Sequence, residues 1–311
     1  MIVMGSVLQY AIDSVAYGSL FAVIALALAL LFGVMRLMNF AYGELIMVGG
    51  FTMYYTRDWG PLPMILATTA VVVLVSVLME LVAFRPVRRG SPVTLLITSF
   101  AVSYGLQQLA FVTVGRGAQK GVEPYPWLTE QHHVAGLRIS NLDMLTMLVA
   151  VLLLVGMTVL LRRTSLGIQL RASTEDFGMA QLVGVRANRV ILSAFAITGL
   201  LASAVTVLYV MRTGSVSPQM GQGPLLIAFV GGVIGGLGSL AGAAFGGFVL
   251  GCLINVLEST LPTSLNGYTV MFAFAAVIAI LVVQPNGLID SAHKLRGRRR
   301  VRTVPPPGGT P

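Results

Sequence analysis

Long apolar runs dominate this chain and restrict what it can fold into. Two examples are Thr68–Leu81 and Leu145–Leu161, which lack the apolar–polar alternation of barrel strands. Only 10% of the 311 residues are charged, whereas soluble domains carry about 25%. Backbone groups in hydrocarbon must be hydrogen-bonded within their own segment, so such runs form helices. We therefore predict an all-α, polytopic membrane helix bundle.

The number of spans follows from the length of the apolar segments, since a span needs about 20 mostly apolar residues. Nine segments qualify, at about 7–32, 37–56, 62–84, 93–113, 142–161, 190–211, 224–239, 240–258 and 268–284. The second and seventh are polar or short, and either can be a broken or re-entrant helix. We therefore expect about eight or nine transmembrane segments in a domain over residues 1–292. Residues 293–311 are basic and rich in Pro and Gly, which predicts a disordered cytoplasmic tail.

The positions of Lys and Arg predict which loops face the cytoplasm. Fifteen of the 20 lie on the side that alternation assigns to the 85–91 loop, the 162–189 loop and the C-terminal tail. The net charge of +9 therefore follows a membrane pattern, and without interleaved aromatic residues it does not indicate nucleic-acid binding. The basic half of the tail is expected to rest on anionic membrane lipid.

The predicted cytoplasmic loop 162–189 is the most polar stretch between apolar runs. It contains a capping pair, two acidic residues for a first turn and a terminating glycine, namely Ser173, Thr174, Glu175, Asp176 and Gly184. Met179, Leu182 and Val183 then recur at helical spacing. A plain positive-inside loop needs arginines but no capped helix. We therefore favour a docking surface for a cytoplasmic partner.

Several polar residues fall inside the predicted spans. Glu44 is the strongest candidate, because a carboxylate in hydrocarbon is costly and usually faces a cavity or a partner. Glu44 either faces a cavity, pairs with another group inside the bundle, or is hydrated near the inner interface. The fourth segment contains Thr94, Thr98, Ser103, Tyr104, Gln107 and Gln108. These residues either line a pore or hydrogen-bond between helices.

Small residues at four-residue spacing recur over 231–251 and predict close helix packing, within the subunit or across a dimer. The pairs are Gly232/Gly236, Gly238/Gly242, Gly242/Gly246 and Gly247/Gly251. By contrast, the chain has no phosphate-binding Gly-x-x-x-x-Gly-Lys-Ser/Thr loop, so we do not expect this chain itself to hydrolyse ATP. His132 and His133 have no clustered ligands, and we predict neither a metal site nor a cofactor.

Several motifs occur in a characteristic order along most of the chain. They are Gly18–Leu26, Leu31–Met35 with Arg36, Asn39–Glu44 (Asn-Phe-Ala-Tyr-Gly-Glu), Thr164–Gly167 (Thr-Ser-Leu-Gly), Ala180–Val185, Gly231–Gly251 and Gln284–Leu288. This order resembles the inner-membrane permeases of branched-chain amino acid ABC importers. Tyr42 stands where that family usually has His, and Gln284 replaces the usual Arg. Tyr42 can therefore signal a different substrate.

The resemblance implies a permease that moves branched-chain or related amino acids across the inner membrane by ATP-driven alternating access. It also implies a homologous second permease subunit, two cytoplasmic ATP-binding subunits and a periplasmic substrate-binding protein as partners. The outer segment 215–224 either helps to receive that binding protein or is an ordinary loop. Permeases for urea or short amides belong to the same family and remain an alternative.

The resemblance also assigns residues. The loop that docks on the ATPase in that family corresponds to Arg171, Glu175, Asp176, Ala180 and Gly184. The family's segment beside the translocation path corresponds to Asn39, Tyr42 and Glu44. The polar content of the fourth segment adds Thr94, Thr98 and Gln107 as candidates for the path. Two alternatives from other classes use the same carboxylate: an ion-coupled secondary transporter with Glu44 as the coupling group, and an intramembrane enzyme with Glu44 and Glu80.

Overall fold

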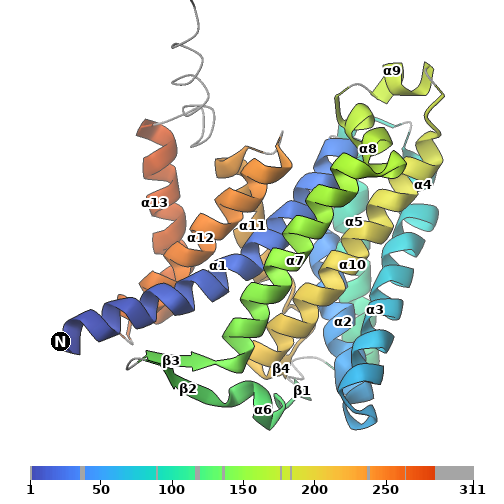
Figure 1. Cartoon of the computed structure of the whole chain (residues 1–311). Helices are drawn as coiled ribbons and strands as arrows, with labels where there is room; N and C mark the ends of the chain where they lie inside the picture. The colour runs from blue at the N-terminus through green and yellow to red at the C-terminus, as the bar shows by residue number, and fades with distance from the viewer. Residues whose placement is uncertain are drawn as a thin grey trace, which may run out of the picture.

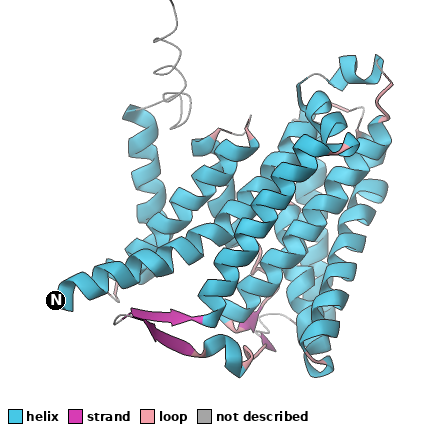
Figure 2. Cartoon of the chain, viewed as in Figure 1, coloured by secondary structure: helices cyan, strands magenta, loops and turns pink. Residues whose placement is uncertain are grey.

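The structure is a computed structural model that describes residues 2–35, 39–88, 90–115, 120–134, 137–175, 177–182, 184–236, 239–262 and 264–283. These residues are almost entirely helical, with four short strands gathered at one end of the bundle (Figure 2). The predicted all-α membrane fold is confirmed. The tail over 293–311 lies outside the described residues, as do Asp176 and Gln284.

Six runs of helix in the described part are long and apolar enough to cross a membrane. They are α1 (Ile2–Met35), the continuous run of α3 (Pro61–Leu78), η2 (Met79–Phe84) and α4 (Arg85–Val87), then α5 (Pro92–Val114), α7 (Asn141–Arg163), α10 (Ala187–Thr213) and α12 (Leu240–Thr260). Two shorter apolar helices are α11 (Gln222–Gly235) and α13 (Thr269–Val283). Helix α2 (Tyr42–Thr56) is also short, but it is less apolar than either. Every predicted segment therefore contains a helix, and the second and seventh are indeed short.

The two ends of the bundle carry different small elements (Figure 1). One end holds α6 (Pro126–Thr129) and two antiparallel strand pairs, β2 (Gln131–Val134) with β3 (Leu137–Ser140) and β1 (Lys120–Gly121) with β4 (Ser215–Val216). The opposite end holds α4, α8 (Ser165–Glu175) and α9 (Phe177–Leu182). The 3-10 helices η1 (Arg57–Trp59) and η3 (Asn266–Tyr268) connect α2 to α3 and α12 to α13. Helix α4 and the α8–α9 segment therefore lie at the same end of the bundle, which is the end predicted to be cytoplasmic.

Helix α1 forms the centre of the bundle. Its residues from Gly18 to Leu31 are all buried, because the helix is apolar on every side and packs against α12, α10, α7 and α11. Its crossing with α12 is close. A β-carbon added to Gly18 would lie 2.5 Å from Cys252 Sγ, and one added to Gly251 would lie 2.9 Å from the Cα of Gly18. Missing side chains therefore set the distance between these two helices.

The beginnings of α2 and α11 meet inside the bundle. The backbones of Gly43 and Gly221 are so close that a β-carbon on Gly221 would overlap the Gly43 carbonyl oxygen. Gly50, two turns further along α2, lies against Val216 and Met220. The seven residues from Gly43 to Gly50 correspond to about 10 Å along α2. The segment from Val216 to Gly221 therefore runs beside α2, from Gly50 back to Gly43, before α11 starts. The 14 residues of α11 span about 21 Å, less than the hydrocarbon core of about 30 Å.

Glycines also bring α11 and α12 together, although at a different register from the predicted one. A β-carbon on Gly246 would overlap the carbonyl oxygen of Gly231, and one on Gly242 would overlap that of Gly235. Gly242 and Gly246 therefore lie at the contact, but their partners on α11 are Gly231 and Gly235. Gly232 is buried in α11. Gly236 instead ends the helix at φ +88° with open space around it. An i, i+4 pair occupies one face of a helix, and the pair that faces α12 starts at residue 231.

Candidate functional site

A buried carboxylate joins α2 to α5. Glu44 lies in the first turn of α2 and is 1% exposed. Its Oε1 accepts hydrogen bonds from Ser103 Oγ at 2.8 Å and from Gln107 Nε2 at 2.6 Å. The two donors are four residues apart and share one face of α5, and the helix N-terminus favours the negative charge. We call Glu44, Ser103 and Gln107 the polar cluster.

Three aromatic rings lie next to the polar cluster, toward the end of the bundle that holds α4, α8 and α9. Phe40 precedes α2 and stacks on Phe100 of α5, with ring centroids 4.3 Å apart and an interplanar angle of 17°. Phe229 of α11 lies 6.1 Å from Phe40 in a tilted arrangement. Phe100 is three residues before Ser103, so both are on one side of α5. We call these three rings the aromatic layer.

An open cavity of about 390 Å³ lies between α2 and α5, on the side of the polar cluster away from the aromatic layer. It is lined by Met47, Val48, Phe51, Thr52, Tyr55, Thr56, Leu106, Leu109, Ala110, Thr113 and Val114. The hydroxyls of Thr52, Thr56 and Thr113 donate to carbonyl groups of their own helices, so the walls are mostly apolar. A space of this size is within the range of small-molecule sites, about 300–1,000 Å³. The cavity, the polar cluster and the aromatic layer follow one another along α5.

Asn39 and Tyr42, both predicted to lie beside the translocation path, lie outside the cavity and the polar cluster. Asn39 is 4% exposed, and its Oδ1 accepts a hydrogen bond from the backbone of Ala41 at 3.0 Å, which closes the turn into α2. Tyr42 is fully buried, and its hydroxyl has no hydrogen-bond partner among the described residues. Neither residue lines the cavity between α2 and α5. The two residues shape the start of α2.

Thr94 and Thr98 do not join the polar cluster. Thr98 is nine residues before Gln107, which places it on the opposite side of α5, because each helical residue turns by about 100°. Thr98 Oγ1 donates to the carbonyl of Thr94 at 2.8 Å, and the Thr94 hydroxyl is 3.0 Å from that of Ser91. Thr94 therefore belongs to the capped start of α5. Of the polar residues predicted in the fourth segment, Ser103 and Gln107 are the ones that meet Glu44.

The loop over 162–189, predicted to be cytoplasmic, folds into two short helices, and its capping residue differs from the predicted one. Thr164 starts α8: its Oγ1 accepts a hydrogen bond from the backbone of Gly167 at 3.0 Å. Ser173, predicted as a cap, is instead 1% exposed within α8 and donates to the Gln169 carbonyl at 2.8 Å. Gly167 allows α8 to fold back on α7, since a β-carbon there would overlap the Leu160 carbonyl oxygen. Thr164, three residues before that glycine, was the signal that the prediction missed.

Helix α9 presents apolar side chains outward at the end of the bundle that also holds α4 and α8. Met179 is 63% exposed and Leu182 is 82% exposed, whereas Ala180 is buried. Gly184 ends the helix at φ +92°, and the backbone N–H of Val185 donates to the Ala180 carbonyl at 3.0 Å. This is the glycine helix end that the sequence predicts. Arg171 is exposed on α8, and Glu175 is the last residue of that helix.

A second buried carboxylate has its own partner, away from the polar cluster. Glu80 lies in the π-helical turn η2, is 1% exposed and forms an ion pair with Arg88. Arg88 also donates to Asn188 Oδ1 at 2.7 Å, in the first turn of α10. Arg88 thus connects the end of the α3–α4 run to the helix that follows the cytoplasmic loop.

These features define a polytopic helical membrane protein with a polar cluster inside the bundle and a folded segment, α8 and α9, at one end. The chain belongs to the family described as the branched-chain amino acid transport system permease component, whose family model matches residues 10–281. It is accordingly a multi-pass inner-membrane permease component of an ABC transport system, which acts with ATP-binding and substrate-binding partners.

Curated relatives cover nearly the whole chain. The chain is 29% identical over 298 residues to the high-affinity branched-chain amino acid transport system permease protein BraD of Pseudomonas aeruginosa, covering 91% of this chain and 95% of that protein. It is 29% identical over 297 residues to the corresponding protein LivH of Escherichia coli K12, with the same coverage. A shorter match, 34% identical over 114 residues, is to the xylose transport system permease protein XylH of Escherichia coli K12, covering 35% of this chain and 29% of that protein.

Proposed function

We propose that this chain is the membrane-spanning subunit that imports branched-chain or related amino acids, using ATP hydrolysed by separate subunits. The family match along residues 10–281 carries this proposal. The two relatives that cover nearly all of the chain are named for branched-chain amino acid transport. The transmembrane domain is proposed to extend over residues 1–292, followed by the tail at 293–311.

We propose that the translocation path follows the cavity, the polar cluster and the aromatic layer. The apolar walls between α2 and α5 suit an aliphatic side chain, and the Glu44 carboxylate suits an ammonium group. The stacked rings of Phe40 and Phe100 close the cytoplasmic end of this route. For alternating access, α5 would separate from Phe40 while α8 and α9 move with the ATP-binding subunits.

The proposed assembly contains a homologous second permease, two cytoplasmic ATP-binding subunits and a periplasmic substrate-binding protein. In an 18-residue apolar stretch of α5, only 22% of the residues are buried, which leaves a wide face for the second permease. The outer segment 215–224 lies beside β1 and α2 and is proposed to receive the binding protein. Specificity then rests largely with that binding protein, because a transient path need not bind tightly.

Transport by the complete assembly tests the proposed function. We expect vesicles containing this chain and its partners to take up labelled leucine only when ATP is supplied, with a protonophore having no effect. Valine and isoleucine should compete, whereas urea and acetamide should not. Uptake that needs a proton gradient and persists without ATP would support the ion-coupled alternative. Preference for urea would overturn the substrate class.

We further propose that α9 docks on an ATP-binding subunit through Met179 and Leu182, with Arg171, Glu175, Asp176, Ala180 and Gly184 supporting this surface. Exposed apolar side chains of this size at the cytoplasmic end indicate a protein contact. Leu182→Asp is expected to weaken co-purification of the ATP-binding subunit at least about tenfold, since burying an unpaired carboxylate in a contact is costly.

The control for this variant is Trp127→Asp, which places the same charge on an exposed apolar residue in α6 at the opposite end of the bundle. It should leave the ATP-binding subunit attached. If Leu182→Asp retains both the subunit and its stimulated ATP hydrolysis, α9 is not the docking element. Gly184→Ala provides a second variant, because alanine strains the positive φ that ends α9.

A further inference from the structure

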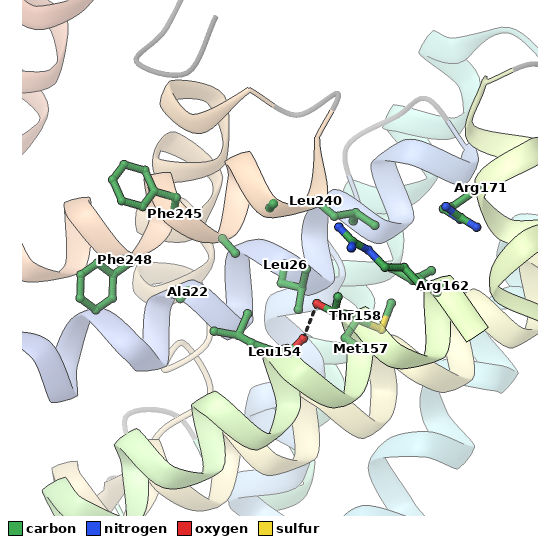
Figure 3. A pocket seen from close by; sticks show the side chains of 13 residues that line it. Ala22, Leu26, Leu154, Met157, Thr158, Arg162, Arg171, Leu240, Phe245 and Phe248 are labelled. Carbon is green, nitrogen blue, oxygen red and sulfur yellow. Dashed lines mark hydrogen bonds between the residues drawn. The ribbon is translucent and has the colours of Figure 1, made fainter. Parts of the chain in front are cut away.

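A groove at the cytoplasmic end lies between α1, α7 and α12 (Figure 3). Its volume is about 560 Å³. Helix α1 packs against both α12 and α7, and its Ala22 and Leu26 lie between the two. The groove is separate from the polar cluster and from the cavity between α2 and α5.

The groove is apolar along most of its length and basic at its cytoplasmic end. Leu154 and Met157 line it on α7, and Phe245 and Phe248 line it on α12. Thr158 Oγ1 donates to the Leu154 carbonyl at 2.8 Å, so this hydroxyl is already bonded within its helix. Arg162 lies eight residues after Leu154, which corresponds to about 12 Å along α7.

Two arginines from different helices meet the cytoplasmic end of the groove. Arg162 belongs to the last turn of α7, and Figure 3 shows its side chain extending along the groove toward Leu240. Arg171 comes from α8, which the close contact at Gly167 holds against α7. The neighbouring Arg163 is also exposed but does not line the groove. The fold, and not the arginine content alone, therefore places two guanidinium groups at the end of an apolar groove.

We propose that this groove binds one anionic phospholipid of the cytoplasmic leaflet. The phosphate lies between Arg162 and Arg171, and one acyl chain lies against Ala22, Leu154 and Phe245. Guanidinium groups match the geometry of phosphate oxygens, and basic pockets between membrane helices on the cytoplasmic side bind anionic headgroups. The apolar length below the arginines distinguishes a lipid from a soluble anion. A lipid here contacts α8 as well as three membrane helices.

Native mass spectrometry of the full-length chain with its co-purifying subunits tests this proposal. The protein is purified in the presence of equal amounts of phosphatidylglycerol and phosphatidylcholine, and retained lipid is counted. We expect phosphatidylglycerol to be retained preferentially. Arg162→Gln should reduce its retention at least about fivefold, since each arginine near an anionic surface strengthens binding by about 1 kcal/mol, which corresponds to about fivefold in affinity. Arg163→Gln is the matched control and should retain the lipid.

A second variant tests the acyl-chain part without changing the charge. Ala241 lines the groove and is exposed, so Ala241→Trp fills the space without disturbing the core. This variant should lose phosphatidylglycerol while keeping the thermal midpoint and subunit composition of the parent. If it detaches a second permease subunit instead, the groove is a protein contact and the lipid site is overturned.

Two further outcomes would contradict the proposal. Equal retention of phosphatidylglycerol by Arg162→Gln and Arg163→Gln would show that the groove arginines do not hold the headgroup. Inorganic phosphate or glycerol phosphate that displaces the lipid at similar concentration would identify a soluble-anion site. We expect neither anion to compete, because neither occupies the apolar length between α7 and α12.

Discussion

Replacing Gly246 with valine is expected to prevent α11 and α12 from assembling. A β-carbon at this position would overlap the carbonyl oxygen of Gly231 and lie 2.6 Å from the backbone nitrogen of Gly235. Backbone cannot rotate away as a flexible side chain can, so the two helices must separate. Overpacking of a well-packed core costs about 1–3 kcal/mol, and we expect a loss at or above the upper end of that range.

The thermal unfolding midpoint of the detergent-purified protein, followed by fluorescence-detected gel filtration, measures this loss. Gly156→Val in α7 is the matched control, because a β-carbon at Gly156 meets no atom within 4 Å. The control should elute as a single peak with a midpoint near that of the parent. If Gly246→Val also keeps its midpoint, the close approach of α11 and α12 at this glycine is wrong.

The second large effect is expected at Glu44. Glu44→Gln keeps the size of the side chain and removes its charge, so the hydrogen bonds with Ser103 and Gln107 change from charge-assisted to neutral. If the carboxylate also meets the ammonium group of the solute, uptake should fall at least about tenfold, since a hydrogen bond to a charged group contributes about 1.5–3 kcal/mol. Uptake of labelled leucine by the complete transporter measures this effect.

Two comparisons separate solute contact from bracing of the bundle. Thr98→Val alters a residue on the far side of α5 and should leave uptake within about twofold of the parent, because its hydroxyl bonds only within its own helix. The thermal midpoint of Glu44→Gln should stay close to that of the parent. A lowered midpoint with proportional loss of uptake would make Glu44 a brace and remove it from the path.

The apolar runs predicted the helices well, because burial in lipid requires long apolar segments whatever their neighbours are. They also identified α2 and α11 as unusual, since these segments are short or polar. The place inside the bundle where α11 begins could not be predicted from the sequence. It depends on the contact between Gly43 and Gly221, two residues far apart in the chain that no local pattern relates.

The polar residues were harder to place than the helices. Glu44 stood out because a carboxylate in a membrane segment is costly, but its donors Ser103 and Gln107 were indistinguishable from Thr94 in composition alone. Pairing depends on how α5 is rotated, and α5 is apolar on several sides, so periodicity does not fix its buried face. For the same reason the glycine register on α11 was predicted one residue late.

The burial of α1 has a consequence for the order in which the protein matures. Helix α1 is synthesised first, yet its glycine at position 18 is covered by α12, which emerges from the ribosome more than 200 residues later. Most of the intervening helices therefore enter the membrane before α1 has its contact with α12. Helix α1 acquires its final neighbours only near the end of translation. A nascent chain that stops short of α12 has no means of closing the bundle around its oldest segment.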